Sequence, residues 1–127
     1  MSERKYLGRG ISEPTRELDL IDWEGGEVEI TLEAAEFTSL CPVTGQPDFG
    51  NIVIRYAPDA KIVETKSLKL YLWSFREQPG FVEQLVSDMA SELFEQLEPF
   101  WLEVEGRFNS RGGISLKTVA SRVREED

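Results

Sequence analysis

The chain contains one thiol, Cys41, and an aspartate, Asp48, follows it seven positions later. Pro42, Gly45 and Pro47 lie between them, so we expect a turn-rich loop. A thiolate is a good nucleophile toward electrophilic carbon, and a carboxyl group that burial keeps protonated can donate protons near neutral pH. A lone cysteine is more often a small buried apolar residue, and an aspartate after proline is often a turn residue. The loop therefore has two interpretations.

Two lysines form a second group with possible chemistry. Lys66 and Lys69 are three residues apart, so on a helix they project from one face and, with a helix N-terminus, can bind an anion. The simpler interpretation is a solvated basic face. Thr65 or Ser67 would then only cap the helix.

Glu83 and Arg111 complete the set of candidate residues. Glu83 falls in the first turn of a predicted helix, where the helix dipole favours a carboxylate. It could instead offer two oxygens to a pair of donors on a planar ligand. Arg111 lies in a predicted turn before Gly112 and Gly113, from which a guanidinium could join the lysines at an anion.

The composition narrows the classes of partner. The net charge is −10, which argues against a nucleic-acid partner because phosphate binding needs clustered Lys and Arg. The chain has no histidine and one cysteine, so we expect no metal. No apolar run reaches the roughly 20 residues of a membrane helix, and one cysteine suits the reducing cytoplasm. At 127 residues, the chain is expected to form one domain and to complete any enclosed site as a homo-oligomer.

Periodicity predicts the elements that must position these residues. Alternating apolar and polar residues indicate strands, and apolar residues at four-residue steps indicate an amphipathic helix ended by Glu98-Pro99. The order strand, strand, helix, helix, strand, strand predicts an α+β fold, an antiparallel sheet of two hairpins with two helices on one face. The predicted strands are 27–33, 51–56, 100–105 and 114–123, the helices are 64–76 and 81–97, and a turn covers 109–113.

The remaining segments show no sustained period. Residues 1–25 are expected to form an N-terminal arm without regular elements, which packs on a neighbour. Residues 26–123 are expected to form the single domain, and residues 124–127 a loose C-terminal tail.

Taken together, the candidate residues resemble a known enzyme family, the short single-domain 7-cyano-7-deazaguanine reductases. These are NADPH-dependent nitrile reductases of queuosine biosynthesis, a tRNA modification pathway. The resemblance implies the tunnelling fold (T-fold, ββααββ), subunits closed into rings that commonly stack in pairs, and active sites between subunits. It is carried, in unbroken order over roughly residues 25–120, by Cys41, Asp48 and the segments 63–71, 74–76, 81–83 and 111–114.

The resemblance also implies roles by position. Cys41 would add to the nitrile carbon to give a covalent thioimide, and Asp48 would supply protons. Two hydrides from NADPH would take the thioimide to 7-aminomethyl-7-deazaguanine, while Glu83 accepts from the ring N–H and amino group of the base. The other implied substrate-binding residues are Val63, Glu64, Thr65 and Val82, and the implied cofactor-binding residues are Lys66, Lys69 and Arg111.

One position departs from the family pattern. Val82 stands where the family normally has histidine, and valine can pack against a ring but can neither donate nor accept a hydrogen bond. Two alternatives therefore accompany the reductase. One is an archaeosine-forming relative that transfers ammonia onto the nitrile in tRNA, which the retained lysine segment and the acidic charge disfavour. The other is a deazapurine-binding protein that traps the nitrile at Cys41 without turnover.

Overall fold

The computed structural model describes residues 13–125 of the chain, apart from the side chains of Ser110 and Arg111. Within these residues the chain alternates strands and helices in an order close to the predicted one. The elements are β1 (Leu20–Asp22), β2 (Ile30–Leu40), β3 (Pro47–Ala57), β4 (Lys61–Val63), α1 (Thr65–Trp73), α2 (Val82–Leu97), β5 (Trp101–Arg111) and β6 (Ile114–Val123).

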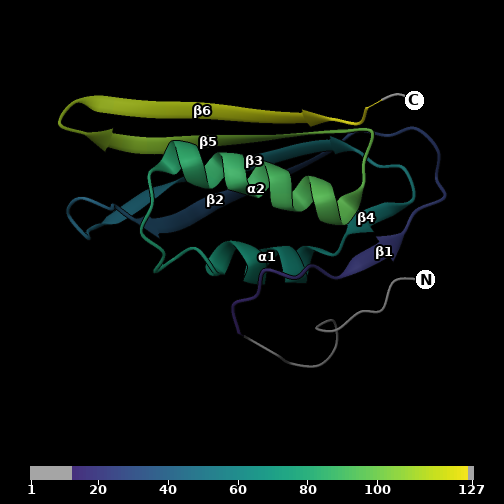
Figure 1. The fold of residues 1–127 in the computed structure, drawn as a ribbon, viewed down its shortest axis with the longest axis horizontal. Coiled ribbons are helices and arrows are strands. Elements are labelled where there is room, and N and C mark those ends of the chain that lie inside the picture. Colours follow the sequence, from purple (N-terminus) through teal and green to yellow (C-terminus); the bar gives the residue numbers. More distant parts are fainter. Residues whose placement is uncertain (1–12, 126–127) are drawn as a thin grey trace.

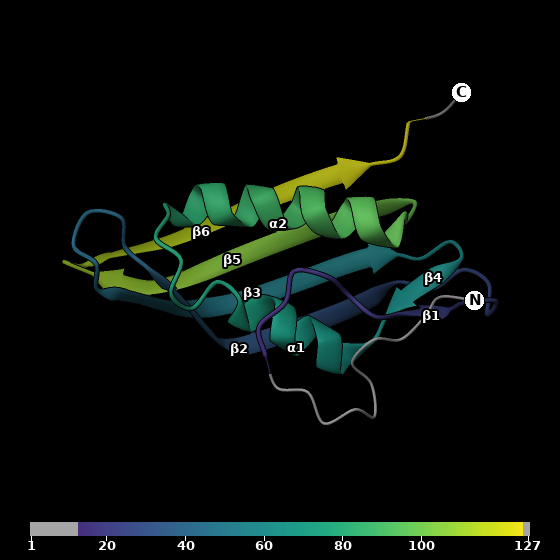
Figure 2. The same cartoon turned by 60° about the horizontal axis from the view of Figure 1, so that its bottom comes forward.

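A four-stranded antiparallel sheet carries both helices on one face (Figures 1 and 2). The strand order is β2-β3-β5-β6, so each predicted hairpin is a pair of neighbouring strands, and β3 pairs with β5 to join them. Strands β2 and β6 form the two edges of this sheet. The predicted α+β arrangement of two hairpins and two helices is confirmed.

β2 extends further than its alternation predicts because a β-bulge changes the phase of the pattern. Ala34 lies opposite Ile52, and Phe37 lies opposite Gly50, so β2 has one residue more than β3 between these pairs. Inward-facing positions are even-numbered before the bulge and odd-numbered after it. The predicted end of this strand at residue 33 is therefore too early.

α2 closes the core against the sheet. Its apolar stripe packs on β5 and β6, and Val86, Met89 and Ala90 are fully buried. The helix ends where predicted, at Leu97. The next residue, Glu98, is its C-cap and takes a left-handed conformation (φ 51°), because a following proline disfavours helical geometry. α1 is shorter than predicted and ends at Trp73. No helix within residues 13–125 has the length and apolar character needed to cross a membrane.

The described part of the N-terminal segment packs against its own chain. β1 pairs antiparallel with β4, with Leu20 opposite Val63, in a small second sheet. We expected no regular element in residues 1–25, and β1 corrects that expectation, since a three-residue strand is too short to show alternation. Residues 1–12 of the expected arm lie outside the described residues.

Two further boundaries differ from the prediction. β5 continues to Arg111, and the second hairpin turns at Gly112 and Gly113, whose positive φ values of 59° and 83° suit a tight two-residue turn. Arg124 does not begin a loose tail, because Nη1 lies 2.9 Å from Asp59 Oδ2 and the guanidinium covers the Phe100 ring. Residues 126–127 lie outside the described part of the chain.

Candidate active site

Cys41 opens the tight loop between β2 and β3. Its N–H donates to the Gln46 carbonyl (2.8 Å), and its carbonyl accepts from the Gly45 N–H (2.9 Å). Gly45 takes a φ of 71°, which is readily available to glycine. The loop is therefore short and closed by its own backbone, and it leaves the thiol half-buried.

Hydrogen bonds favour the thiolate form of Cys41. The Thr44 hydroxyl, followed by the backbone groups of Thr44 and Val43, lowers the pKa of the thiol below its ordinary value. Burial and the nearby Asp48 carboxylate raise it, but by less. A lower pKa increases the thiolate fraction at neutral pH, and the thiolate is the nucleophilic form.

Asp48 lies across the hairpin from Ser39 of β2. Side chains directly opposite each other on antiparallel strands share one face of the sheet. Ser39 is fully buried, and its hydroxyl has no hydrogen-bond partner within residues 13–125. Leaving such a group unpaired costs about 1–3 kcal/mol. The carboxylate next to the thiol thus faces a buried hydroxyl whose hydrogen-bonding capacity is unused by the described residues.

The start of α2 lies beside the same loop. The Gly80 N–H donates to the Leu40 carbonyl (3.1 Å), and the Leu40 N–H donates to the Gln78 carbonyl (3.2 Å). Pro79 therefore forms an isolated parallel β-bridge with Leu40, and Leu40 immediately precedes Cys41 in the sequence. This places the first turn of α2 at the end of the sheet that holds the thiol.

The three residues at the start of α2 differ in exposure. Glu83 is exposed, and Phe81 is 62% exposed although it is a large aromatic residue. Val82 is only 9% exposed and belongs to the hydrophobic core. The core surrounds the Val82 side chain, so its placement does not favour the substrate contact that the resemblance implies.

The predicted residues 63–65 lie at the opposite end of the sheet from Cys41. The Val63 N–H donates to the Tyr56 hydroxyl (3.1 Å), and Tyr56 is eight residues from Asp48 along β3. At about 3.3 Å per residue, the two ends are about 26 Å apart. A single chain therefore keeps residues 63–65 away from the thiol (Figure 1).

Glu64 is the N-cap of α1. Its carboxylate accepts from the backbone N–H groups of Lys66 (2.8 Å) and Ser67 (2.9 Å), and the residue is only 7% exposed. Our expectation that Thr65 or Ser67 caps this helix is wrong, because the longer Glu64 side chain folds back onto the first turn. Val63 is equally buried, whereas Thr65 is exposed.

A hollow of about 700 Å³ lies between the edge strand β2 and α1. Lys69 and Arg76 line it, together with Trp73, and the Arg76 guanidinium lies 5.7 Å from the centre of the Trp73 ring. Two cations beside an aromatic plane suit an anionic ligand that also carries a ring. The β2 wall of the hollow carries Glu33 and Glu36.

The other two predicted cations lie elsewhere. Lys66 is half-buried and is not part of the lining of the hollow. Arg111 ends β5 beside the Gly112–Gly113 turn, at the Cys41 end of the sheet, and its side chain lies outside the described part of the structure. The structure thus separates Lys69 from Arg111, which the sequence had grouped.

Comparison with known proteins decides the family. The family model described as QueF-like protein matches residues 47–127. The chain belongs to the QueF-like family. It is 42% identical over 122 residues to the NADPH-dependent 7-cyano-7-deazaguanine reductase of Syntrophus aciditrophicus (strain SB), a match that covers 94% of this chain and 86% of that protein.

Relatives from Helicobacter are more similar over a shorter stretch. The protein of the same name from Helicobacter pylori (strain Shi470) is 58% identical over 97 residues, covering 76% of this chain. The match spans 66% of the length of that relative. Among solved structures, the apo archaeosine synthase QueF-Like superposes with a TM-score of 0.67 at 18% identity, over 78% of this chain and 95% of that one. This likeness establishes the tunnelling fold for the chain.

Four features of this QueF-like chain were not predicted from the sequence. They are the Thr44 hydrogen bond to the thiol, the buried Ser39 hydroxyl, the exposed Phe81 ring and the Arg76–Trp73 pair. The Thr44-Gly45 pair was a usable signal for the hydrogen bond to the thiol. A tight turn at this pair folds the Thr44 hydroxyl back toward Cys41, the first residue of the loop. The other three depend on tertiary packing.

Proposed function

We propose that this chain reduces the nitrile of 7-cyano-7-deazaguanine to the amine, 7-aminomethyl-7-deazaguanine, with NADPH, in queuosine biosynthesis in the cytoplasm. The observation that carries the proposal is the hydrogen-bonded thiol of Cys41 beside Asp48. The names of the Syntrophus and Helicobacter relatives support the same activity.

Cys41 supplies the nucleophile in this proposal. The thiol proton of Cys41 passes to the Asp48 carboxylate, and the thiolate sulfur adds to the nitrile carbon. The C≡N bond becomes C=N, and the nitrogen takes the proton from Asp48, which leaves a covalent thioimide. When bound, NADPH supplies a hydride for each of the two reductions, between which sulfur leaves with the electron pair of the C–S bond. Asp48 lies in the hairpin with Cys41, so a carboxyl group is at hand for each proton.

The start of α2 is proposed to hold the base. Glu83 is exposed in the first turn and can accept from a ring N–H and an amino group with its two oxygens. Phe81 presents an exposed ring on which a bicyclic base can stack. Both lie at the Cys41 end of the sheet, so they can orient the nitrile toward the thiol.

The hollow beside α1 is proposed to hold the cofactor. Its volume of about 700 Å³ is within the usual range of ligand pockets, and Lys69 and Arg76 supply positive charge for phosphates. Lys66 and Arg111 remain proposed cofactor contacts, the first from the same helix and the second from the end of β5.

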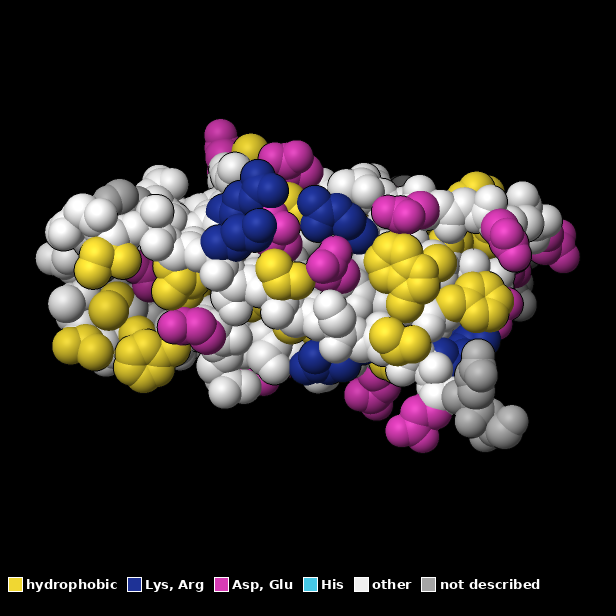
Figure 3. All heavy atoms as spheres, turned by 90° about the horizontal axis from the view of Figure 1, so that it is seen from above, with side chains coloured by type: hydrophobic (Ala, Val, Ile, Leu, Met, Phe, Trp, Pro, Cys, Tyr) yellow, Lys and Arg dark blue, Asp and Glu magenta, His cyan; other side chains and the backbone are white. Residues whose placement is uncertain are grey.

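A complete site requires two copies of the chain in this scheme. Residues 63–65 and Cys41 lie at different ends of one sheet, and a neighbouring copy can bring the two groups together. The edges β2 and β6 are available for such pairing, and β6 exposes Ile114, Val119 and Val123. Seen from the β6 side, hydrophobic side chains gather toward both ends of the molecule, and Lys and Arg lie mostly nearer the middle (Figure 3). We therefore propose a homo-oligomer with shared sites.

Adduct formation tests the chemistry directly. The protein is mixed with 7-cyano-7-deazaguanine, with and without NADPH, while intact mass and cofactor absorbance are followed. We expect a mass increase equal to the nitrile without NADPH, and NADPH oxidation with amine formation when it is present. Cys41→Ala should abolish the adduct, and an adduct that survives this change would mean that the nucleophile is misassigned.

Complementation tests the shared site. Cys41→Ala and the double variant Lys66→Ala with Lys69→Ala are produced separately and then co-expressed. If each site takes the thiol from one copy and the lysines from another, random assembly restores about a quarter of the sites. No recovery in mixed oligomers would show that both groups act within one chain.

One observation favours a second candidate. Val82 is buried in the core and offers no polar group where the family normally has histidine. A protein lacking that group could form the thioimide and stop, as a deazapurine-binding protein would. Adduct formation without NADPH oxidation is the result that would select this candidate over the reductase.

A further inference from the structure

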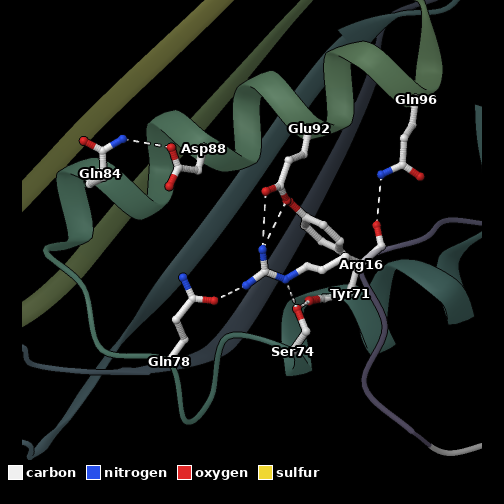
Figure 4. Close-up of polar contacts among 8 residues, drawn as sticks. All are labelled: Arg16, Tyr71, Ser74, Gln78, Gln84, Asp88, Glu92 and Gln96. Carbon is white, nitrogen blue, oxygen red and sulfur yellow. Dashed lines mark hydrogen bonds and ion pairs between the residues drawn. The ribbon is translucent and has the colours of Figure 1, made fainter.

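Arg16 ties the N-terminal segment to three parts of the chain (Figure 4). Its Nε donates to Ser74 Oγ after α1 (2.5 Å), and Nη1 donates to the Glu92 carboxylate of α2 (3.3 and 3.4 Å). Nη2 donates to Gln78 Oε1 in the linker between the helices. The guanidinium also lies over the Phe75 ring, 3.7 Å from its centre. One side chain thus holds both helices and the linker that joins them.

The segment that carries Arg16 is itself fixed. The Gln96 side chain donates to the Arg16 carbonyl (3.0 Å) and accepts from the Leu18 N–H (2.9 Å). Glu92 is oriented by the Tyr71 hydroxyl, which donates to it at 2.6 Å. The Arg16 side chain is 39% exposed. Its position is nevertheless fixed, because Gln96 holds the backbone around Arg16 and Tyr71 holds its partner Glu92.

The Gln78 contact leads from Arg16 to Leu40, the residue before Cys41. The Gln78 carbonyl accepts from Leu40, and Gly80 donates back to Leu40, so residues 78–80 lie along the last residue of β2. Cys41 is the next residue. A movement of this linker therefore moves the residue before the nucleophile and the residues just before α2 together.

We infer that Arg16 is a positioning residue for the Cys41 thiol, acting through Gln78 and the linker 78–80. The inference rests on the proposed function, and it adds a residue outside the 47–127 stretch that the family model matches. Arg16 takes no part in the bond-making steps. It fixes the linker against β2, and a small displacement of a nucleophile reduces reaction rates strongly even when binding is retained.

The alternative is that Arg16 only stabilises the fold, and Arg122 provides the matched control. Arg122 also reaches from outside α2 to that helix, where it donates to the Ser87 carbonyl (3.1 Å) and to Ser91 Oγ (3.0 Å). None of its described contacts involves the linker 78–80. Arg122→Ala should therefore lower stability without changing the thiol.

The test compares Arg16→Ala, Gln78→Ala, the double variant and Arg122→Ala at a temperature where all are folded. Cys41 is the sole cysteine, so alkylation by iodoacetamide, followed by intact mass, reports on that thiol alone. The second readout is the rate of adduct formation with 7-cyano-7-deazaguanine at saturation. Gln78→Glu, which keeps an acceptor for Arg16, serves as the conservative variant.

We expect Arg16→Ala and Gln78→Ala each to slow adduct formation roughly 10- to 100-fold and to change the alkylation rate. The double variant should be no slower than Arg16→Ala, since the two residues act in series. Gln78→Glu should retain the wild-type rate. Rates in Arg16→Ala that equal those in Arg122→Ala, or losses that add in the double variant, would overturn the inference.

The two proposals can fail separately. If the wild-type protein forms no adduct with the nitrile, the proposed function fails, and the alkylation series still measures the effect of Arg16 on Cys41. If the adduct forms normally in every variant, the proposed function stands, and the positioning role is refuted.

Discussion

Replacing Glu64 tests whether its main task is to cap α1. In the structure its two carboxylate oxygens accept from the N–H groups of Lys66 and Ser67. Glu64→Ala removes both acceptors, and the Ser67 N–H, which is buried, then has no replacement partner in the cap. Glu64→Gln keeps one oxygen and replaces the other with an amide nitrogen that cannot accept, so it removes one of the two bonds.

The magnitude follows from these contacts. Loss of an N-cap side chain costs about 0.5–2 kcal/mol, and a buried N–H left unpaired costs about 1–3 kcal/mol. Because the two costs describe the same groups and overlap, we expect Glu64→Ala to lower the free energy of unfolding by about 2 kcal/mol. Glu64→Gln should lower it by about 1 kcal/mol, since half of the bonds remain.

Urea unfolding measures these differences, with the midpoint shifting and the slope unchanged. All variants are compared at one protein concentration, because self-association changes apparent stability. Glu83→Ala is the matched control, since that carboxylate also lies in a first helical turn but is exposed, and the N-cap of α2 makes no side-chain hydrogen bond. The control should lose less than about 1 kcal/mol. Equal losses in Glu64→Ala and Glu83→Ala would refute the capping role.

Three other changes have defined outcomes. Thr44→Val removes the hydroxyl that lowers the pKa of Cys41, so the pKa of the thiol should rise and its alkylation at pH 7 should slow. A pH–rate profile of alkylation measures this change. An unchanged profile would contradict the role of the Thr44 hydroxyl. Gly106→Ala places a Cβ 2.7 Å from a side-chain carbon of α2 and should destabilise the fold by about 1–3 kcal/mol in urea unfolding. Burial and the Glu92 carboxylate raise the pKa of Tyr71 in the folded protein. The free energy of unfolding should therefore fall as pH rises above about 10, where the tyrosine of the unfolded chain ionises. Tyr71→Phe should make that fall shallower.

Local periodicity was sufficient to predict the sheet and helices but not all of their ends. α2 was predicted almost to the residue because its apolar stripe faces a single surface along its whole length. β2 was predicted only in part, since a bulge after Ala34 moves the inward-facing positions by one residue and the alternation disappears. β1 was missed because three residues carry no period, and its pairing with β4 is a tertiary contact.

The sequence by itself determined the order of the four main strands and two helices, the absence of histidine and the nucleophile candidate at the end of the first hairpin. It also grouped Cys41 and Glu83 with the residues 63–69, because their order along the chain resembles that of one family. Only the tertiary structure decided how far apart they lie. A strand extends about 3.3 Å per residue, so β3 holds residues 63–65 about 26 Å from the Cys41 end of the sheet within one chain, a distance that no spacing in the sequence reveals. In the same way, the contact of Arg16 with the linker before α2 depends on the packing of the N-terminal segment across both helices, which no local pattern encodes.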